Sequence, residues 1–260
     1  MAAKSSKQKI TFINVLQILT LAALLGYMEY AVDSGAVNKV FMASPYSILK
    51  EAARIITDGT LWPHLFLTLQ EVAVGYALAA AFGIAVGLIW TMFPKVEAYS
   101  NVFFSSVMAI PKTAILPLLI LWFGIGFKSK VVLIFLFSVF QILYNTVTGA
   151  KECKIEYLKV ARVFNATKMQ TVFKVMLPAA LPSMFNGLRL AAATALTGVV
   201  FSEMQSAKAG LGYLLSESQT LLNTPRMFFI IILVTVISVC FVKLIAVIEY
   251  LVCHRWKGIV

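Results

Sequence analysis

Residues 227–251 read MFFIIILVTVISVCFVKLIAVIEYL, an almost unbroken apolar run. Wound as an α-helix, these residues are about 37 Å long, which exceeds the roughly 30 Å hydrocarbon core of a bilayer. Five further runs of this kind precede it, at residues 12–32, 65–92, 103–124, 131–149 and 183–203. Because helices satisfy their own backbone hydrogen bonds in lipid, the sequence predicts an all-α polytopic membrane protein with about six transmembrane helices.

The composition of the whole chain agrees with that prediction. Of 260 residues, 60% are hydrophobic and only 13% are charged, and the mean hydropathy is +0.89. Soluble domains carry roughly a quarter charged residues, so a water-soluble domain is excluded, as are disorder, collagen and coiled coil. The alternating short strands of an outer-membrane barrel are also absent from the pattern.

The basic residues predict how the chain lies in a cell inner membrane. With a cytoplasmic N-terminus, the inner segments carry twelve Lys and Arg residues and the outer segments seven, which favours both termini in the cytoplasm. The net charge of +11 is then an orientation signal, and no nucleic-acid partner is expected. A cleaved signal peptide is the alternative at the N-terminus, but the first apolar run is longer than a signal core.

These observations divide the chain into five predicted segments. They are a cytoplasmic N-terminus (1–11), a first transmembrane helix (12–32), an external segment with an interfacial helix (33–64), a core (65–251) that includes a cytoplasmic loop (150–182), and a cytoplasmic C-terminus (252–260). The interfacial helix is predicted from Ser44, a helix cap followed by Pro45, and from apolar residues at helical spacing thereafter. It lies either along the membrane or against an external partner.

Two of the apolar runs carry packing signals. In the second run, Ala79, Gly83 and Gly87 form a row of small residues that lets another helix approach closely, within one subunit or between two. In the third run, Pro111 and Pro117 each remove a backbone hydrogen bond, so the helix is predicted to be kinked or broken. Irregular backbone at membrane depth either lines a transport cavity or reflects simple packing.

Three ionisable residues lie in or beside apolar runs, namely Lys112, Arg189 and Glu203. Charges are costly in lipid, so each is either part of a solute pathway or half of a structural ion pair. For Arg189, near the inner end of its apolar run, a third alternative is that the side chain simply extends to the membrane surface. Glu71 near the outer end of the second run is expected to reach the interface as a lone carboxylate.

The cytoplasmic segment 151–182 is amphipathic. Its first part places one set of residues on a single helix face: Ile155, Leu158, Ala161 and Arg162. Asn165 follows, and Asn tolerates the left-handed backbone conformation, so we predict a helix, a turn at Asn165 and a second helix. Pro178 and Pro182 predict that this second helix ends before residue 177. The hairpin is either a membrane-surface element or a docking surface for a soluble partner.

In this hairpin the sequence resembles the permease subunits of ATP-binding-cassette (ABC) importers. Their motif runs Glu-Ala-Ala, three residues, Gly, nine residues, Ile, any residue, Leu-Pro. The corresponding positions here are Lys159-Val160-Ala161, Asn165 and Val175-Met176-Leu177-Pro178, with every spacing kept. Lys159 replaces the motif's Glu, which removes the salt bridge that the Glu would make unless Glu156, one turn earlier, serves instead. Asn165 replaces the Gly and suits the same turn.

The resemblance extends over roughly residues 40 to 250. Residues 111–126 and 181–214 are similar to the nitrate, sulfonate and taurine importer permeases. It implies the ABC type I importer permease fold, a homodimer of this chain, two ATPase subunits and an external substrate-binding protein. It implies ATPase coupling through Glu156, Leu158, Lys159, Ala161, Arg162, Phe164, Asn165, Val175, Leu177 and Pro178. A translocation pathway or gate is expected at Pro111, Lys112, Pro117, Trp122, Arg189, Glu203, Gly210 and Gly212.

The chain has no Gly-rich loop of the kind that holds nucleotide phosphates, and its three cysteines and two histidines do not form a zinc motif. We therefore expect no enzyme activity or cofactor in this chain, with ATP and Mg bound by the partner ATPase. The resemblance implies a small anion of the nitrate, sulfonate or taurine kind, or a pyrimidine vitamin precursor, as the solute. Glu71 stands where many sulfonate-type members have Arg and resembles the branch associated with pyrimidine vitamin precursors. The alternative is a self-sufficient ion-coupled transporter or channel, which would usually show internal repeats.

Overall fold

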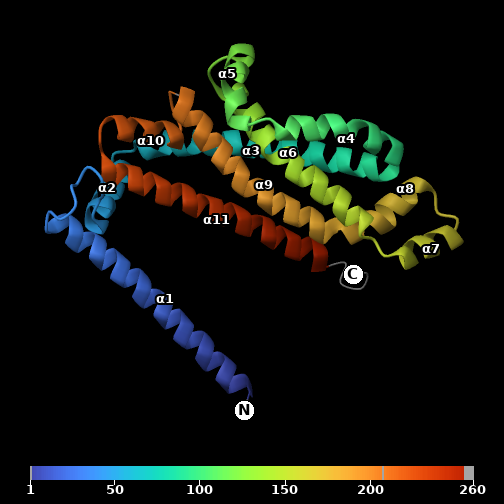
Figure 1. Ribbon diagram of the computed structural model, residues 1–260, viewed down its shortest axis with the longest axis horizontal. Helices are drawn as coiled ribbons and strands as arrows, with labels where there is room; N and C mark the ends of the chain where they lie inside the picture. Colours follow the sequence, from blue (N-terminus) through green and yellow to red (C-terminus); the bar gives the residue numbers. More distant parts are fainter. Residues whose placement is uncertain (1, 207, 255–260) are drawn as a thin grey trace. The chain divides into compact units, whose positions relative to one another are not determined.

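The computed structural model describes residues 2–206 and 208–254, with side chains from residue 13 to 253 (Figure 1). Met1, Ala207 and residues 255–260 lie outside the described residues, and the predicted cytoplasmic termini therefore lie partly outside them. The regular structure of the described residues is helical throughout, which confirms the all-α prediction. The helices are α1 Ala2–Asp33, α2 Pro45–Thr57, α3 Leu61–Met92, α4 Pro94–Ala109, α5 Lys112–Phe123, α6 Phe127–Lys151, α7 Ile155–Val163, α8 Lys168–Thr171, the π-helix η1 Val172–Met176, α9 Leu177–Ser206, α10 Leu211–Thr220 and α11 Thr224–His254.

The number of transmembrane helices agrees with the prediction of about six. Five stretches of the described residues are long and apolar enough to cross a membrane: Ile13–Asp33, Leu61–Met92, Phe127–Lys151, Lys168–Ser206 and Thr224–Cys253. The pair α4 and α5 meets the same criteria together and is bent by 94° at its break. The sixth span is therefore a broken one, or a re-entrant segment.

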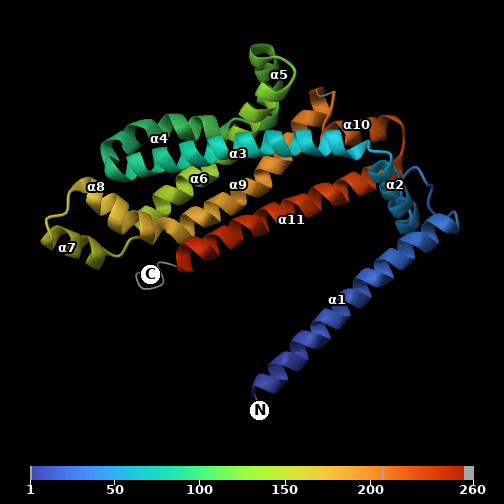
Figure 2. The same ribbon diagram turned by 180° about the vertical axis from the view of Figure 1, so that it is seen from behind.

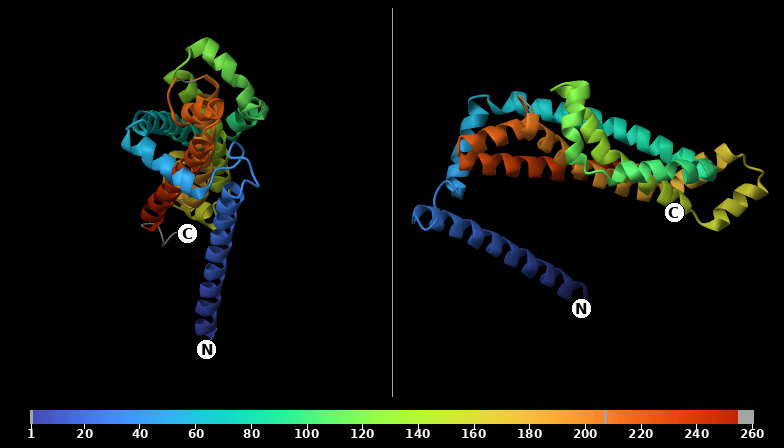
Figure 3. Two further views of the ribbon diagram at one scale, coloured as in Figure 1. Left: turned by 90° about the vertical axis from the view of Figure 1, so that its left-hand side faces the viewer. Right: turned by 45° about the horizontal axis from the view of Figure 1, so that its top comes forward.

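The break between α4 and α5 coincides with the first of the two prolines. Ile110, whose backbone is extended (φ −67°, ψ 130°), ends α4, and Pro111 precedes α5. This conformation is the one that a residue before proline favours. Pro117, by contrast, lies inside α5 without ending it. The kink or break predicted for the run at residues 103–124 is thus confirmed at Pro111 (Figure 3).

The chain forms two compact units. The first contains the residues up to Trp62 together with Leu214–Ile232. Here Ser44 caps α2, its hydroxyl accepting the Ser47 N–H, and Pro45 is the first helical residue. These features confirm the helix predicted in the external segment, since N-cap serine and N1 proline both favour a helix start.

The second unit contains Pro63–Tyr213 and the chain from Leu233 onward, and α3, α6 and α9 run side by side in it (Figures 1 and 2). The row of small residues on α3 faces α6. A Cβ on Gly83 would lie 3.0 Å from the Val139 carbonyl oxygen, and one on Gly87 would lie 2.8 Å from Thr146 Cβ. The row therefore serves packing within this subunit, which is one of the two alternatives left open by the sequence.

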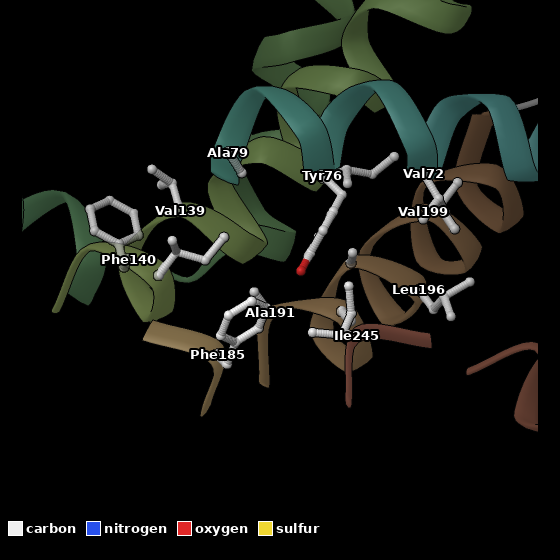
Figure 4. Close-up of a cluster of buried hydrophobic side chains, with 14 residues drawn as sticks. Val72, Tyr76, Ala79, Val139, Phe140, Phe185, Ala191, Leu196, Val199 and Ile245 are labelled. Atoms are coloured by element: carbon white, nitrogen blue, oxygen red, sulfur yellow. The ribbon is translucent and has the colours of Figure 1, made fainter. Parts of the chain in front are cut away.

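Apolar side chains from α3, α6, α9 and α11 form the main core of this unit (Figure 4). Tyr76 of α3 is the polar member of that core, and its hydroxyl donates a hydrogen bond of 2.9 Å to the Leu188 carbonyl of α9. A buried tyrosine hydroxyl needs such a partner. The bond fixes α3 against α9 at the centre of the bundle.

The predicted end of the cytoplasmic helix before residue 177 is wrong. The chain is continuously helical from Lys168 to Ser206 through α8, η1 and α9. In the π-helical turn, the Leu177 N–H bonds to the Val172 carbonyl, five residues back. The π-helical turn replaces the usual hydrogen bonds between residues four apart immediately before Pro178. The missing N–H of Pro178 therefore falls where the α-helical pattern is already interrupted, and the helix continues through the proline. Pro182 is likewise inside α9.

Candidate functional site

The hairpin of α7 and α8 is shaped by local sequence. Asn165 has φ of +50°, which confirms the turn predicted there. The Asn165 N–H bonds to the Arg162 carbonyl and the Ala166 N–H to the Ala161 carbonyl, at 3.0 and 2.9 Å. These two bonds form a Schellman C-cap, in which the left-handed residue closes the helix. Thr167 then starts α8 in a reciprocal capping box with Gln170, so both sides of the turn are fixed.

The hairpin exposes large apolar side chains. Phe164 is 80% exposed and Val163 79%, and Val160 is also exposed, whereas Ala161 is buried. A cavity of about 420 Å³ lies on this side of the hairpin, lined by Tyr157, Val160, Ala161, Phe164, Ala166, Gln170, Lys174 and Val175. Exposed apolar surface around a concavity is typical of a site where another protein docks.

The other residues predicted to couple to an ATPase also lie in or beside the hairpin. Glu156, Lys159 and Arg162 are exposed, Leu158, Val175 and Leu177 are half-buried, and Pro178 is buried. Among the described residues, no ion pair is found for Glu156. Its service in place of the motif's Glu therefore stays a prediction.

Four of the predicted pathway residues share one short element. Pro111 directly precedes α5, and Lys112, Pro117 and Trp122 belong to it. The Lys112 ammonium lies 5.6 Å from the centre of the Phe140 ring of α6, within the range of a cation–π contact. Pro117 and Trp122 are exposed. The remaining predicted pathway residues lie on α9 or in the turn after it.

Glu203, near the end of α9, organises the turn that leads into α10. Its carboxylate is 1% exposed and accepts hydrogen bonds from the Thr68 hydroxyl and the Gly212 N–H, each 2.7 Å long. The Thr68 oxygen in turn accepts the Leu211 N–H at 2.9 Å. The Gly210 N–H donates to His64 Nδ1, also at 2.9 Å. Three consecutive backbone amides are therefore held by side chains of α3 and α9.

The two glycines of this turn have no room for a side chain. Gly210 has φ of +119°, and a Cβ there would lie 2.2 Å from the Glu203 carboxyl carbon. On Gly212 a Cβ would lie 2.3 Å from the Val200 carbonyl oxygen. The structure thus brings together Glu203, Gly210 and Gly212. Their role as a gate remains a prediction.

Beside Glu203 lies an ion pair that the sequence analysis missed. Glu71 is 0% and Lys130 3% exposed, and the Lys130 ammonium is 2.8 Å from Glu71 Oε1. The expectation that Glu71 reaches the interface as a lone carboxylate is wrong. Lys130 is one of the seven basic residues that the sequence analysis counts to the outer segments, but α6 starts at Phe127, so Lys130 lies inside a helix. The sequence signal that could have predicted this pair is one acidic residue, Glu71, and one basic residue, Lys130, in or beside two apolar runs.

Arg189, in the middle part of α9, forms an ion pair with Glu249 of α11. It does not extend alone to the membrane surface, and the structure supports the structural ion pair that the sequence left open. Such a pair inside a helical bundle satisfies two charges that would otherwise face lipid. Arg189 is not part of the group around Glu203.

Comparison with known proteins agrees with this architecture. The family described as "Binding-protein-dependent transport system inner membrane component" matches residues 81–252. The putative aliphatic sulfonates transport permease protein SsuC of Bacillus subtilis is 29% identical over 221 residues, which cover 85% of this chain and 80% of SsuC. The formylaminopyrimidine transport permease protein ThiX of Halalkalibacterium halodurans is 28% identical over 221 residues, 85% of this chain and 88% of ThiX. An inward-facing structure of the MetNI methionine ABC transporter superposes with a TM-score of 0.60 at 22% identity, over 73% of this chain and 93% of the matched chain.

Proposed function

The chain belongs to the family of binding-protein-dependent transport system inner membrane components, and on that basis we propose that two copies of it form the pathway of an ABC importer for a small solute. Members of this family are multi-pass inner-membrane permeases of ABC transporters and are not themselves catalytic. ATP and Mg are then bound by two separate ATPase subunits, and an external binding protein delivers the solute. Both termini of this chain lie in the cytoplasm in this proposal.

The observation that carries the proposal is the exposed apolar surface of the hairpin. A phenylalanine that is 80% exposed beside a concavity is stabilised when a partner covers it. The Schellman turn and the capping box hold the hairpin in one shape, so it can be displaced as a body when the ATPases close. The coupling residues are those of the motif and their neighbours, from Glu156 to Pro178.

The continuous helix from Lys168 to Ser206 supplies a route for the displacement. It joins the second arm of the hairpin to Glu203, whose carboxylate accepts the Gly212 N–H. A shift of the permease from about 1:99 to 99:1 between inward-facing and outward-facing states needs roughly 5.5 kcal/mol of differential interaction. A capped hairpin on a continuous helix transmits that free energy better than a loop that melts.

For the solute, we propose a small anion such as a sulfonate, or a pyrimidine precursor. The names of SsuC and ThiX assign aliphatic sulfonates and formylaminopyrimidine to those two proteins, and this chain is similarly related to both. Glu71 does not favour either solute directly, because its carboxylate is buried against Lys130. Selection by the external binding protein is consistent with both.

Reconstitution in proteoliposomes tests the proposal. Transport is expected only when the ATPase, ATP and the binding protein are all present; transport by the chain alone would instead support an ion-coupled transporter. Leu158→Asp, Ala161→Asp and Phe164→Asp are expected to reduce co-purification of the ATPase at least tenfold, which corresponds to about 1.4 kcal/mol. Phe41→Asp is the matched control, since Phe41 is 79% exposed in the first unit. Unchanged assembly and transport in all three hairpin variants would refute coupling through the hairpin.

A further inference from the structure

The group around Glu203 contains more acidic side chains than basic ones. It contains two carboxyl groups, Glu71 and Glu203, and one ammonium group, Lys130, which pairs with Glu71. Glu203 accepts a hydrogen bond from Thr68, which lies one turn before Glu71 on the same face of α3. All three side chains are almost fully buried. If both carboxyl groups were ionised, one negative charge would remain uncompensated in a region shielded from water, which is strongly unfavourable.

One oxygen of the group also lacks a hydrogen-bond partner. Glu71 Oε2 is buried and has none among the described residues, whereas Glu71 Oε1 accepts from Lys130. Both oxygens of Glu203 are engaged, Oε1 by the Thr68 hydroxyl and Oε2 by the Gly212 N–H. Hydrogen bonds to a carboxylate favour its charged form, and Glu203 accepts one on each oxygen, although the Thr68 hydroxyl also lies 3.1 Å from the His64 carbonyl; we therefore assign the negative charge to Glu203. Glu71 Oε2 is the position where an added proton would complete the bonding.

We propose that Glu71 carries a proton on Oε2 and donates it in a hydrogen bond to the Glu203 carboxylate, and that this proton locks the Gly210–Gly212 turn onto α3 and α9. The protonated group is neutral overall, with Lys130 balancing Glu203. Loss of the proton places a second negative charge beside Glu203 and weakens the group that holds the Gly212 and Leu211 amides.

The other titratable groups near the turn are consistent with such a lock. His64 of α3 accepts the Gly210 N–H at Nδ1, so that nitrogen carries no proton, and its ring stacks on Tyr213 of α10 at 5.6 Å. Lys130 is the facing charge from α6. Lys208, in the segment before the turn, is exposed. The closed turn therefore needs a proton on Glu71 and none on His64 Nδ1.

Infrared spectroscopy of the full chain in lipid nanodiscs detects the proton directly. The wild-type protein is expected to show the carbonyl stretch of a protonated carboxylic acid at neutral pH. Glu71→Gln, which keeps the shape and a hydrogen-bond donor, is expected to lose that band, whereas Glu217→Gln in the first unit is expected to keep it. A wild-type spectrum without the band, or a band that survives in Glu71→Gln, would overturn the proposal. Neither result depends on transport, so a failure here is distinct from a failure of the proposed function.

A labelling experiment tests the lock itself. In full-length protein whose three native cysteines are replaced, Lys208→Cys is labelled with a maleimide as the pH is raised from neutral to mildly alkaline. Thiol reactivity also rises with pH, so rates are divided by those of Phe41→Cys, an exposed reference in the first unit. The normalised rate is expected to rise several-fold in the wild-type background and to stay level with Glu71→Gln. Equal pH dependence in the two backgrounds would refute the lock.

Discussion

The two ends of the long helix formed by α8, η1 and α9 differ in which side chains they bury and which they expose. At its C-terminal end, charged side chains are buried and paired, with Glu203, Glu71 and Lys130 each no more than 3% exposed. Beside its N-terminal end, in the hairpin with α7, large apolar side chains such as Phe164 are exposed around a cavity. Buried charges that are paired within one chain define a single arrangement and need no partner. Exposed apolar surface is completed only by another molecule.

The largest effect is expected from removing the cation of the buried end. Lys130→Met leaves the Glu203 carboxylate buried without a balancing charge, and breaking such a pair costs about 3–5 kcal/mol. We expect a marked fall in the thermal midpoint of the purified chain in nanodiscs. Lys128→Met is the matched control two residues earlier, because Lys128 is exposed and has no ion pair among the described residues. Equal midpoints for the two variants would mean that the buried end does not depend on charge balance.

The contrast between the two ends also explains what the sequence predicted. The hairpin was found because its determinants are local: Asn165 for the left-handed turn and the apolar spacing of α7. The pairing of Glu71 with Lys130 was missed because 59 residues separate them, and only the packing of α3 against α6 brings them together. Each residue alone was read as a group at the membrane surface.

Prolines show the same limit. Pro111 and Pro117 carry equal signals in the sequence, yet only Pro111 breaks the chain, since Leu116 and Leu119 hold α5 against α6 on either side of Pro117. Pro178 was read as the end of a helix, but the π-turn before it lets the helix continue. Packing and hydrogen-bond register, which are not local in the sequence, decide these cases.

A smaller, local effect is expected at the hairpin turn. Asn165→Val places a β-branched residue in the left-handed region, at a cost of roughly 1–2 kcal/mol, whereas Asn165→Gly avoids that cost. Hydrogen exchange at the end of α7 is expected to be faster in the valine variant and unchanged in the glycine variant. Affinity for the ATPase should fall in the same order. If valine and glycine behave alike, the shape of the hairpin is imposed by its surroundings and not by the turn.

A weaker effect still is expected from the charge at the edge of the docking surface. Lys159 is exposed and stands where the family motif has Glu. If it faces an acidic groove of the ATPase, Lys159→Glu slows association several-fold, and the slowing diminishes at high salt, as for other charges at the rim of an interface. Association kinetics at two ionic strengths measure this. Faster association of the variant would show that the groove prefers the motif's Glu.

The smallest effect is expected at a partly exposed charge cluster in the first unit. Its contribution to stability can be compared with that of the buried group of Lys130, Glu71 and Glu203. Glu51 Oε1 accepts hydrogen bonds from Arg54 at 2.6 Å and from Arg226 and Asn223 at 3.1 Å. The bond from Arg54 is the main cause that lowers the pKa of Glu51 below its ordinary value of 4.5. Because the folded-state pKa is the lower one, the cluster stabilises the fold above pH 4.5, and this contribution is lost as the pH falls through the lowered value.

Glu51→Gln should therefore be less stable than the wild type near neutral pH and equal to it in acid. The difference should be less than about 1 kcal/mol, because the Arg54 side chain, which makes the shortest bond to Glu51, is 54% exposed and its pairing is screened by salt. Thermal midpoints of both proteins across the acid range, at low and high salt, measure the difference, with Glu152→Gln as an exposed control. A deficit that stays constant with pH and salt would mean that Glu51 contributes through packing. The comparison with Lys130→Met would then no longer separate exposed from buried charge.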